Sequence, residues 1–322
     1  MRNRKKKSTK LVPSRRTKRQ KPTISIIGAG RLGTALGRAL SAIGLSVEAV
    51  AANHGASARR AAKVIGSSPR PLAASQLNEL PDSKIILITT PDDVIGEVAA
   101  ELGRLAKVSG KGSTVRARGR IVLHASGALS SEVLAPLREA GFAVGSMHPL
   151  VSISDRASEA ATFRNAFFCL EGDRGAVSAA RSIVRQLGGQ SFLLSSSNKP
   201  LYHAAAVLAS GHMVALFDIA NEMLVQCGLS RRRARAILIP LLRSTVANLS
   251  ARSPARALTG TFARGEAATA RRHLAAIRRH HLDDARAAYL LLGKRSLRLA
   301  KQSGVDPKAL NEIAREIGLA SD

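Results

Sequence analysis

Four side chains capable of acid–base or hydrogen-bonding chemistry stand beside predicted element boundaries. Lys199 and His203 are four residues apart at the start of a predicted helix, so they share one face of it. His124 and Ser126 come at the end of an apolar run that predicts a buried strand. A lysine whose pKa is lowered by burial can act as a general acid or base, and histidine and serine can hold or polarise a substrate. A surface lysine followed by a buried histidine is the alternative interpretation.

Two further segments are predicted to end at the same rim. His148 closes the strand that follows His124, although a single histidine in such a place is more often structural. Thr90 and Pro91 follow another apolar run, and the carboxyl edge of a parallel sheet is where ligands bind in such folds. The acidic pair after Pro91 fits the cap of the next helix, which is the commoner use of aspartate there.

A glycine-rich turn stands between a predicted strand, residues 23–27, and a predicted helix, residues 34–43. In a strand–turn–helix unit with the spacing G-x-G-x-x-G, the glycines allow a tight turn, a close approach of a pyrophosphate and close helix–strand packing. The helix N-terminus then offers unpaired N–H groups to the phosphates. The candidate cofactor-binding residues of this turn are Gly28, Gly30, Arg31, Leu32 and Gly33.

The end of the second predicted strand bears on which dinucleotide is bound. NAD-binding proteins usually place an acidic residue there for the ribose 2′-hydroxyl, but this strand ends in Asn53 and His54. Arg59 and Arg60 follow closely, and no acid is present to repel a 2′-phosphate. The pattern favours NADP over NAD, with an ordinary solvated helix face as the alternative. The candidate cofactor residues outside the turn are Asn53, His54, Arg59, Thr90 and Pro91.

The elements that position these residues alternate between strand and helix as far as about residue 197. Such alternation predicts an α/β, doubly wound Rossmann domain with a mainly parallel sheet. Apolar residues then recur at helical spacing without a convincing strand, which predicts an all-α C-terminal domain. The predicted organisation is a disordered basic tail over 1–21, a Rossmann domain over 22–197 and a helical domain over 198–322. Residues 103–120 are predicted to form a loop.

Composition limits the remaining possibilities. The net charge is +28, and residues 1–21 hold eleven Lys or Arg and no acid. This tail can neutralise phosphates nonspecifically, but it has no aromatic residue for base stacking, so nucleic acid is an unlikely partner. Only two cysteines occur, far apart, which predicts a reducing compartment and no metal site. No apolar run reaches the length of a membrane span, so we expect a cytoplasmic protein.

The order of the motifs resembles a known group of proteins. The matching segments are Gly28–Gly33, Thr90–Asp93, His124–Leu129, Gly145–Leu150, Lys199–Ala205 and Ala257–Glu266. They are similar to those of presumed oxidoreductases that pair a Rossmann-like domain with the domain of unknown function 2520. The resemblance covers about residues 22–318. Thr261 stands where close relatives have proline.

More distantly, the layout resembles 6-phosphogluconate dehydrogenase and the β-hydroxyacid dehydrogenases. That resemblance implies a 6-phosphogluconate-dehydrogenase-like helical domain, a substrate-binding turn at Ser126-Gly127, a catalytic lysine at Lys199 and a homodimer formed through the helices. Those dehydrogenases have an asparagine four residues after the lysine, where this chain has His203. The substrate is therefore open among keto, imino and hydroxy acids.

The sequence therefore predicts an NADP-dependent oxidoreductase that transfers a hydride to or from a small substrate in an interdomain cleft. Lys199 is the first candidate for acid–base work, and the other candidates for substrate contact are His203, His124 and Ser126. The alternative is a non-catalytic NADP-binding sensor or regulatory protein, because a Rossmann domain can bind a nucleotide without reducing anything.

Overall fold

The computed structural model describes residues 21–108, 114–155 and 160–318, so the predicted tail lies outside the described residues except for Lys21. The chain divides into two compact units, residues 1–206 and 207–322. The division falls within helix α6 (Lys199–Ala209), a few residues after the predicted domain boundary at 198.

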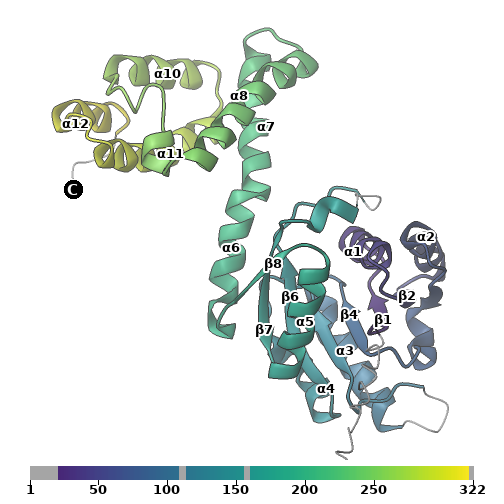
Figure 1. Cartoon of the computed structure of the whole chain (residues 1–322). Helices are drawn as coiled ribbons and strands as arrows, with labels where there is room; N and C mark the ends of the chain where they lie inside the picture. Colours follow the sequence, from purple (N-terminus) through teal and green to yellow (C-terminus); the bar gives the residue numbers. More distant parts are fainter. Residues whose placement is uncertain (1–20, 109–113, 156–159, 319–322) are drawn as a thin grey trace, which may run out of the picture. The chain divides into compact units, whose positions relative to one another are not determined.

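Unit 1 is built on one eight-stranded sheet with the spatial order β3-β2-β1-β4-β5-β6-β7-β8 (Figure 1). All neighbouring strands run parallel except β6 and β7. The strands are β1 (Ile24–Ile27), β2 (Val47–Ala52), β3 (Arg70–Ala73), β4 (Ile85–Ile88), β5 (Ile121–His124), β6 (Ala143–Pro149), β7 (Phe167–Gly172) and β8 (Gln190–Leu193). The central strands β1 and β4 are buried throughout, which fits the continuous apolar sequence of β4 and the mainly apolar sequence of β1.

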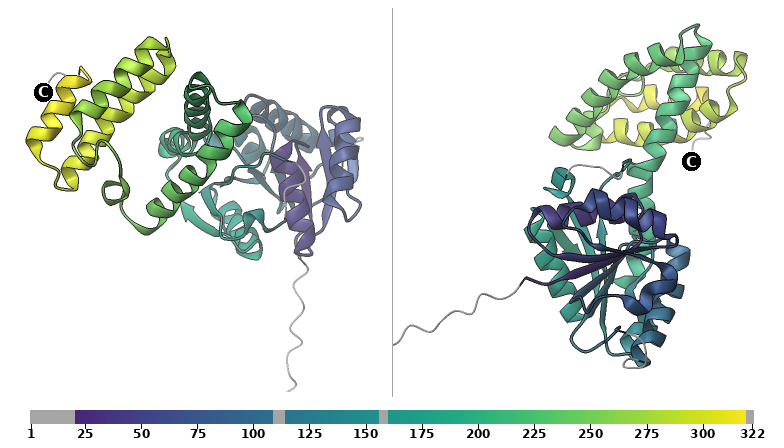
Figure 2. Two further views of the ribbon diagram at one scale, coloured as in Figure 1. Left: turned by 90° about the horizontal axis from the view of Figure 1, so that it is seen from above. Right: turned by 90° about the vertical axis from the view of Figure 1, so that its right-hand side faces the viewer.

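Helices cover both faces of this sheet, as Figure 2 shows. One core contains apolar side chains of α1, α2 and α5, and the other contains those of α3 and α4. The helices of unit 1 are α1 (Arg31–Ala42), α2 (Gly55–Ile65), α3 (Asp92–Lys107), α4 (Ala135–Glu139), α5 (Arg174–Gln186) and α6, with short 3₁₀ turns η1 (Ala74–Glu79), η2 (Ser131–Leu134), η3 (Ala160–Phe163) and η4 (Ser196–Asn198). The predicted doubly wound Rossmann architecture is confirmed.

Three local predictions need correction. The short strand β3 was missed, because its sequence Arg-Pro-Leu-Ala lacks an apolar run and it pairs at the sheet edge. The predicted loop from residue 103 begins later, since α3 continues to Lys107. The apolar pattern at helical spacing over residues 200–227 predicts one continuous helix, but Ser210 has a non-helical backbone and divides the segment into α6 and α7.

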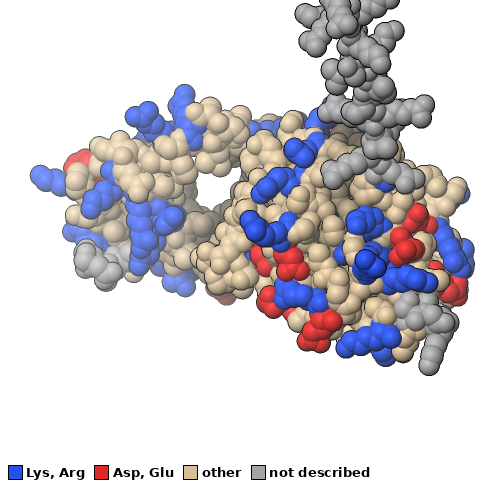
Figure 3. All heavy atoms as spheres, turned by 60° about the horizontal axis from the view of Figure 1, so that its bottom comes forward, with Lys and Arg blue, Asp and Glu red and all other residues tan. Residues whose placement is uncertain are grey.

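Unit 2 contains only helices among the residues described. Its helices are α7 (Gly211–Gln226), α8 (Arg231–Ala251), α9 (Pro254–Ala257), α10 (Ala267–Arg279), α11 (Asp283–Gln302) and α12 (Pro307–Glu316). Its core is small, and α10 and α12 contribute Ala270, Leu274 and Ile313 to it. The predicted helical C-terminal domain is therefore confirmed. Basic side chains outnumber acidic ones on the faces visible in Figure 3.

One helical segment, Ser196–Gln226, is long and apolar enough by length and composition alone to cross a membrane. This finding corrects the expectation that no segment would reach that length, because the segment is helical and apolar on average although polar residues interrupt its apolar runs.

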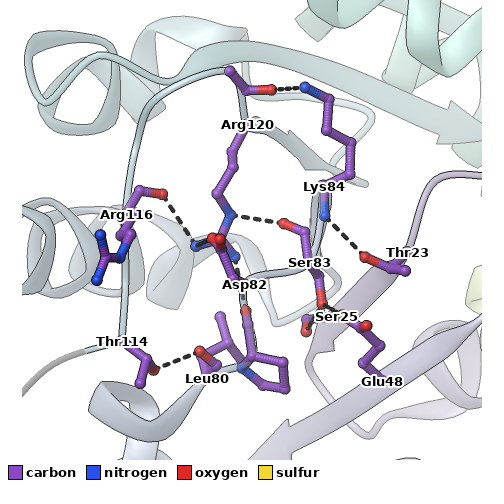
Figure 4. Close-up of polar contacts among 12 residues, drawn as sticks. Thr23, Ser25, Glu48, Leu80, Asp82, Ser83, Lys84, Thr114, Arg116 and Arg120 are labelled. Atoms are coloured by element: carbon purple, nitrogen blue, oxygen red, sulfur yellow. Dashed lines mark hydrogen bonds and ion pairs between the residues drawn. The ribbon is translucent and has the colours of Figure 1, made fainter.

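The amino edge of the sheet is fixed by a buried arginine at the start of β5. Arg120 is 3% exposed, and its guanidinium donates hydrogen bonds to the carbonyl oxygens of Ser83 (2.7 Å), Pro81 (3.0 Å) and Arg116 (3.1 Å), as Figure 4 shows in part. Asp82 lies 3.4 Å away and completes an ion pair. The cation is thereby satisfied, which a buried charge requires.

Candidate functional site

A first cavity, of about 530 Å³, lies over the glycine-rich turn. Residues of the turn, of the end of β2 and of the start of α3 surround it. Its lining residues are Ile27, Gly28, Ala29, Gly30, Ala51, Ala52, Asn53, Ser57, Ala74, Leu77, Thr89, Thr90, Pro91, Val94, Glu97 and Val98. The glycine-rich turn and the residues after two strands thus meet at one edge, as the sequence predicted.

The three glycines of the turn have distinct surroundings. A Cβ added to Gly33 would lie 2.0 Å from the carbonyl oxygen of Gly28, so α1 packs against the strand too closely for any side chain there. Gly28 has a φ of +120°, which strongly favours glycine. A Cβ at Gly30 would meet nothing within 4 Å, so this residue borders open space at the N-terminus of α1. The first turn of α1 carries no acidic residue, which suits an anion.

Some of the polar residues after β2 line the first cavity, and others lie outside it. Asn53 and Ser57 line the cavity, and Arg60 donates a hydrogen bond to the Ser57 hydroxyl at 3.1 Å. His54 is the N-cap residue of α2, and Arg59 is exposed on that helix; neither lines the cavity. Ser57 therefore lines the cavity with Arg60 hydrogen-bonded to it, whereas the predicted cofactor residues His54 and Arg59 do not line it.

A second cavity, of about 440 Å³, adjoins the first because Thr89 and Thr90 line both. Every residue that lines it belongs to unit 1. These residues are Arg31, Leu32, Thr89, Thr90, Asp92, Ala125, Ser126, Gly127, His148, Pro149, Val151, Ile153 and His203. Thr90 presents a buried hydroxyl that has no hydrogen-bond partner among the described residues.

Ser126 lines this cavity, but its hydroxyl is engaged within the protein. It donates a hydrogen bond to Asp92 Oδ2 at 2.8 Å and accepts bonds from the N–H groups of Ala128 (3.2 Å) and Leu129 (3.0 Å). The hydroxyl has one proton and two lone pairs, so these three bonds use its capacity. Ser126 thus holds its own turn in place and ties it to the start of α3.

His124 lies beneath that turn and outside both cavities. Its Nδ1 accepts a hydrogen bond from the Ser126 N–H, and its Nε2 lies 3.2 Å from the carbonyl oxygen of Ser130. Burial, with the nearby positive charge of Lys199, lowers the pKa of His124 to about 3, so the ring is neutral at ordinary pH. The predicted substrate-holding residue therefore has the geometry of an internal brace, because both ring nitrogens already have partners.

Lys199 is fully buried at the start of α6, and it too is absent from the cavity walls. Its Nζ donates hydrogen bonds to the carbonyl oxygen of Ser126 at 3.0 Å and to Ser146 Oγ at 2.5 Å. Burial lowers its pKa. The predicted acid–base lysine thus does not line the cavity. It contacts the site through its hydrogen bond to the backbone of the Ser126-Gly127 turn.

Two imidazoles do face the second cavity. His148, from β6, and His203, from α6, stand edge to face with ring centroids 5.5 Å apart. Both rings lie against Gly127, where an added Cβ would be 2.3 Å from His203 Nδ1 and 2.9 Å from His148 Nε2. The buried Nδ1 of His203 has no hydrogen-bond partner among the described residues. Of the four predicted catalytic candidates, His203 and Ser126 therefore line the cavity, and His124 and Lys199 support it.

Two residues of this site were underrated by the sequence patterns. Asp92 was interpreted as a helix cap, yet its carboxylate accepts the Ser126 hydroxyl bond across the cavity wall. Tyr202 was assigned no role from the sequence, although its hydroxyl lies 2.7 Å from His148 Nδ1. The position of Asp92 two residues after Thr90 was an available signal, but the contact of Tyr202 depends on how α6 lies over β6 and β7.

Comparison with known proteins agrees with this architecture. Residues 9–149 match a family described as a Rossmann-like domain, and residues 166–296 match the domain of unknown function 2520. No curated protein has a matching sequence.

Several solved structures share the fold. A protein named "putative NADP oxidoreductase" from Bacteroides fragilis has 21% identity and a TM-score of 0.67, with 87% of this chain and 98% of that chain covered. A protein from Thermotoga maritima has 22% identity and the same TM-score, with 87% and 100% covered. An imine reductase from Myxococcus stipitatus, in complex with NADP⁺, has 18% identity and a TM-score of 0.61, with 91% and 99% covered.

The two domain matches account for most of the chain in the order that the structure shows, a Rossmann-like sheet domain followed by helices. The chain therefore belongs to the proteins that join a Rossmann-like domain to the domain of unknown function 2520.

Proposed function

We propose that this protein is an NADP-dependent oxidoreductase acting on a small keto, imino or hydroxy-acid-like substrate. The observation that carries the proposal is the pair of adjoining cavities that share Thr89 and Thr90. A dinucleotide in the first cavity would place its nicotinamide end toward the second, where the substrate would lie. The bound nicotinamide would supply or accept the hydride.

The residues of the first cavity fit a dinucleotide. Open space at Gly30 and the acid-free start of α1 suit the pyrophosphate, and Arg31 adds a positive charge beside it. The unpartnered hydroxyl of Thr90 offers a hydrogen bond that the protein itself does not satisfy. Gly33 contributes by packing, and Leu32 and Pro91 contribute cavity wall.

NADP is proposed over NAD on the residues after β2. Asn53 and Ser57 line this end of the cavity, and Arg60 is hydrogen-bonded to Ser57. Arg59 lies on the same helix, whose N-cap residue is His54, and would strengthen the positive field. The NADP-bound imine reductase supports this choice by its shared fold.

The supporting residues have proposed roles in the second cavity. His203 and the Ser126-Gly127 turn would contact the substrate, and Asp92 would fix that turn. Lys199 and His124 would act as positioning residues, because their hydrogen bonds end on atoms of the turn and of β6. Exchange of Lys199 for alanine is then expected to reduce turnover far more than NADPH affinity.

The first test is titration of the purified protein with NADPH and NADH, followed by nicotinamide fluorescence. We expect preferential binding of NADPH. Gly30→Ala should weaken that binding about tenfold without loss of stability, because its methyl group enters the pyrophosphate space. Gly211→Ala is the matched control, since a Cβ there also meets nothing within 4 Å. Absence of binding for both nucleotides would refute the proposal.

A second variant tests the choice of nucleotide. Ser57→Asp would place a carboxylate at the proposed 2′-phosphate position, so it should weaken NADPH binding by about tenfold or more while NADH binding changes little. Arg60→Ala and Arg59→Ala, measured side by side, separate the cation that contacts Ser57 from its neighbour. Equal losses for both nucleotides in Ser57→Asp would contradict the NADP assignment.

A non-catalytic NADP sensor is the second candidate, favoured only by the internal satisfaction of Ser126, His124 and Lys199. It predicts tight NADPH binding and no NADPH oxidation with any keto acid, ketone or cyclic imine. Oxidation of NADPH that depends on one of these compounds would decide for the enzyme.

We also propose a cytoplasmic homodimer formed through the helical unit. Large apolar side chains are exposed on its helices, among them Val214 (70%), Leu241 (63%) and Leu291 (72%). A second copy would cover them and would account for the apolar segment Ser196–Gln226 without a membrane. Light scattering in detergent-free buffer should give twice the chain mass; a monomer, or a need for detergent, would overturn this.

Nucleic acid is at most a nonspecific partner of the basic tail, with binding lost at moderate salt.

A further inference from the structure

A row of polar side chains lies on one face of β6 and β7. Ser146 and His148 alternate along β6, and Cys169 is the register partner of His148 on the antiparallel neighbour β7. Helix α6 lays Lys199 and Tyr202 against this row. A sheet face that packs against a helix is usually apolar, so this cluster calls for an explanation.

His148 is held on one side by Tyr202. Its Nδ1 lies 2.7 Å from the Tyr202 hydroxyl, and the two rings meet edge to face at 5.6 Å. The same hydroxyl is hydrogen-bonded to the Cys169 thiol. Burial raises the pKa of both the phenol and the thiol, so both keep their protons at neutral pH.

These contacts determine where His148 carries its own proton. The Tyr202 O–H can be donated to the thiol sulfur or to the imidazole nitrogen, and nitrogen is much the stronger acceptor. The thiol can in turn donate its S–H to the phenol oxygen. Nδ1 of His148 is then an acceptor, and the ring proton of the neutral imidazole lies on Nε2.

The Nε2 side of the ring faces the second cavity. His148 and Gly127 both line that cavity, and the absent side chain of Gly127 leaves the approach to Nε2 open. Among the described residues, the hydrogen bond found for this ring is that of Nδ1 with Tyr202, and none is found for Nε2. A half-buried ring that is hydrogen-bonded on one side and has no hydrogen bond on the cavity side is arranged to bind a ligand atom.

We propose that His148 is a catalytic residue whose Nε2–H donates a hydrogen bond to the carbonyl oxygen or imine nitrogen of the substrate, and that Tyr202 is the positioning residue that fixes this tautomer. The assignment rests on the proposed oxidoreductase function and deepens it by naming the acceptor group. When hydride adds to the substrate carbon, negative charge develops on that oxygen or nitrogen. The hydrogen bond stabilises this charge, and the neutralising proton comes from solvent.

The charges around the ring support a neutral donor. His203, Tyr202 and Lys199 face His148 from α6, and Cys169 faces it from β7. Burial, together with His203 and Lys199, lowers the pKa of His148 to about 4. The ring is therefore neutral throughout the range in which such an enzyme would work.

The test uses two-bond ¹H–¹⁵N correlation spectra of the full-length ¹⁵N-labelled protein saturated with NADPH. His148→Gln assigns the His148 signals by their disappearance. We expect the Nε2–H tautomer at pH 7 and a shift toward the Nδ1–H form in Tyr202→Phe. Tyr289→Phe is the matched control: Tyr289 contacts His273 Nδ1 at 2.9 Å with rings 5.9 Å apart, and its loss should leave His148 unchanged. An Nδ1–H or charged His148 in the unaltered protein, or no response to Tyr202→Phe, would overturn the proposal.

A turnover measurement completes the test. With any keto or imino compound that supports NADPH oxidation, His148→Gln should lower kcat about 100-fold and Tyr202→Phe about tenfold, while NADPH affinity changes less than twofold. Unchanged kcat in His148→Gln would refute the catalytic role. NADPH binding is measured on the same samples. If the oxidoreductase proposal itself is wrong, the unaltered protein will fail to bind NADPH, and this result is distinct from an unchanged kcat in His148→Gln.

Discussion

The two edges of the same sheet differ in one respect, which is whether every buried polar atom described below has a hydrogen-bond partner within the protein. At the amino edge, the Arg120 guanidinium has three carbonyl acceptors and an ion-pair partner (Figure 4). At the carboxyl edge, Thr90 Oγ1 and His203 Nδ1 are buried without partners among the described residues.

The difference teaches how to separate structural from functional polarity in this chain. A buried polar atom without a partner costs free energy, so a protein retains it where a ligand supplies the missing bond. Burial and residue type alone would not make this distinction, since Arg120 and Lys199 are both buried basic residues that form hydrogen bonds within the protein. The expected consequences are changes in stability at one edge and changes in ligand affinity at the other.

The largest expected effect is at the amino edge. Arg120→Met should lower the free energy of unfolding by about 3 kcal/mol or more, because three carbonyl oxygens lose their donor. Urea denaturation measures this, with the exposed Arg118→Met as a control expected within about 0.5 kcal/mol. NADPH affinity of the folded Arg120→Met protein should be unchanged; a loss of affinity at constant stability would break the comparison.

The next effect is in the pH dependence of stability. The pKa of His124 is about 3 in the folded chain and about 6.5 when unfolded, so below pH 6.5 the unfolded state binds the extra proton. Stability should therefore fall as the pH drops, with His124 contributing about 3 kcal/mol between pH 6.5 and 4. His124→Asn keeps an acceptor for the Ser126 N–H but cannot titrate, so its slope should be shallower. Parallel slopes would show that His124 is not the buried neutral group inferred.

The smallest effect separates the two edges most sharply. Thr90→Val replaces an unpartnered hydroxyl by a methyl group of similar size, so the free energy of unfolding should change by less than about 1 kcal/mol or should rise. NADPH affinity should fall about tenfold, since the hydroxyl is proposed to serve the cofactor. Destabilisation without loss of affinity would place Thr90 with Arg120 among the structural groups.

Much of the fold was accessible from the sequence. The short, mainly apolar stretches 24–27 and 85–88 alternate with helical patterns, which predicted buried parallel strands, and the glycine-rich turn identified the first strand–helix unit. The edge strand β3 and the break at Ser210 were missed, because both depend on neighbours rather than on local pattern.

The site was accessible only as a set of segments. Sequence spacing correctly predicted that Thr90, Ser126 and the glycine turn would reach one edge. It did not predict which polar atoms would be left without a partner at the cavity. The Ser126 hydroxyl and the Lys199 ammonium form hydrogen bonds within the protein, whereas Nε2 of His148 does not. That outcome depends on where α6 lies over β6 and β7, a long-range contact that no local spacing encodes.

The crowding at Gly127 has a consequence for related sequences. Because a methyl group there would overlap His203 and press on His148, the three positions form one steric unit. A relative with any larger residue at the position of Gly127 must therefore have lost or moved at least one of the two imidazoles. Sorting members of the family by this triplet should divide those that share this protein's substrate chemistry from those that have diverged.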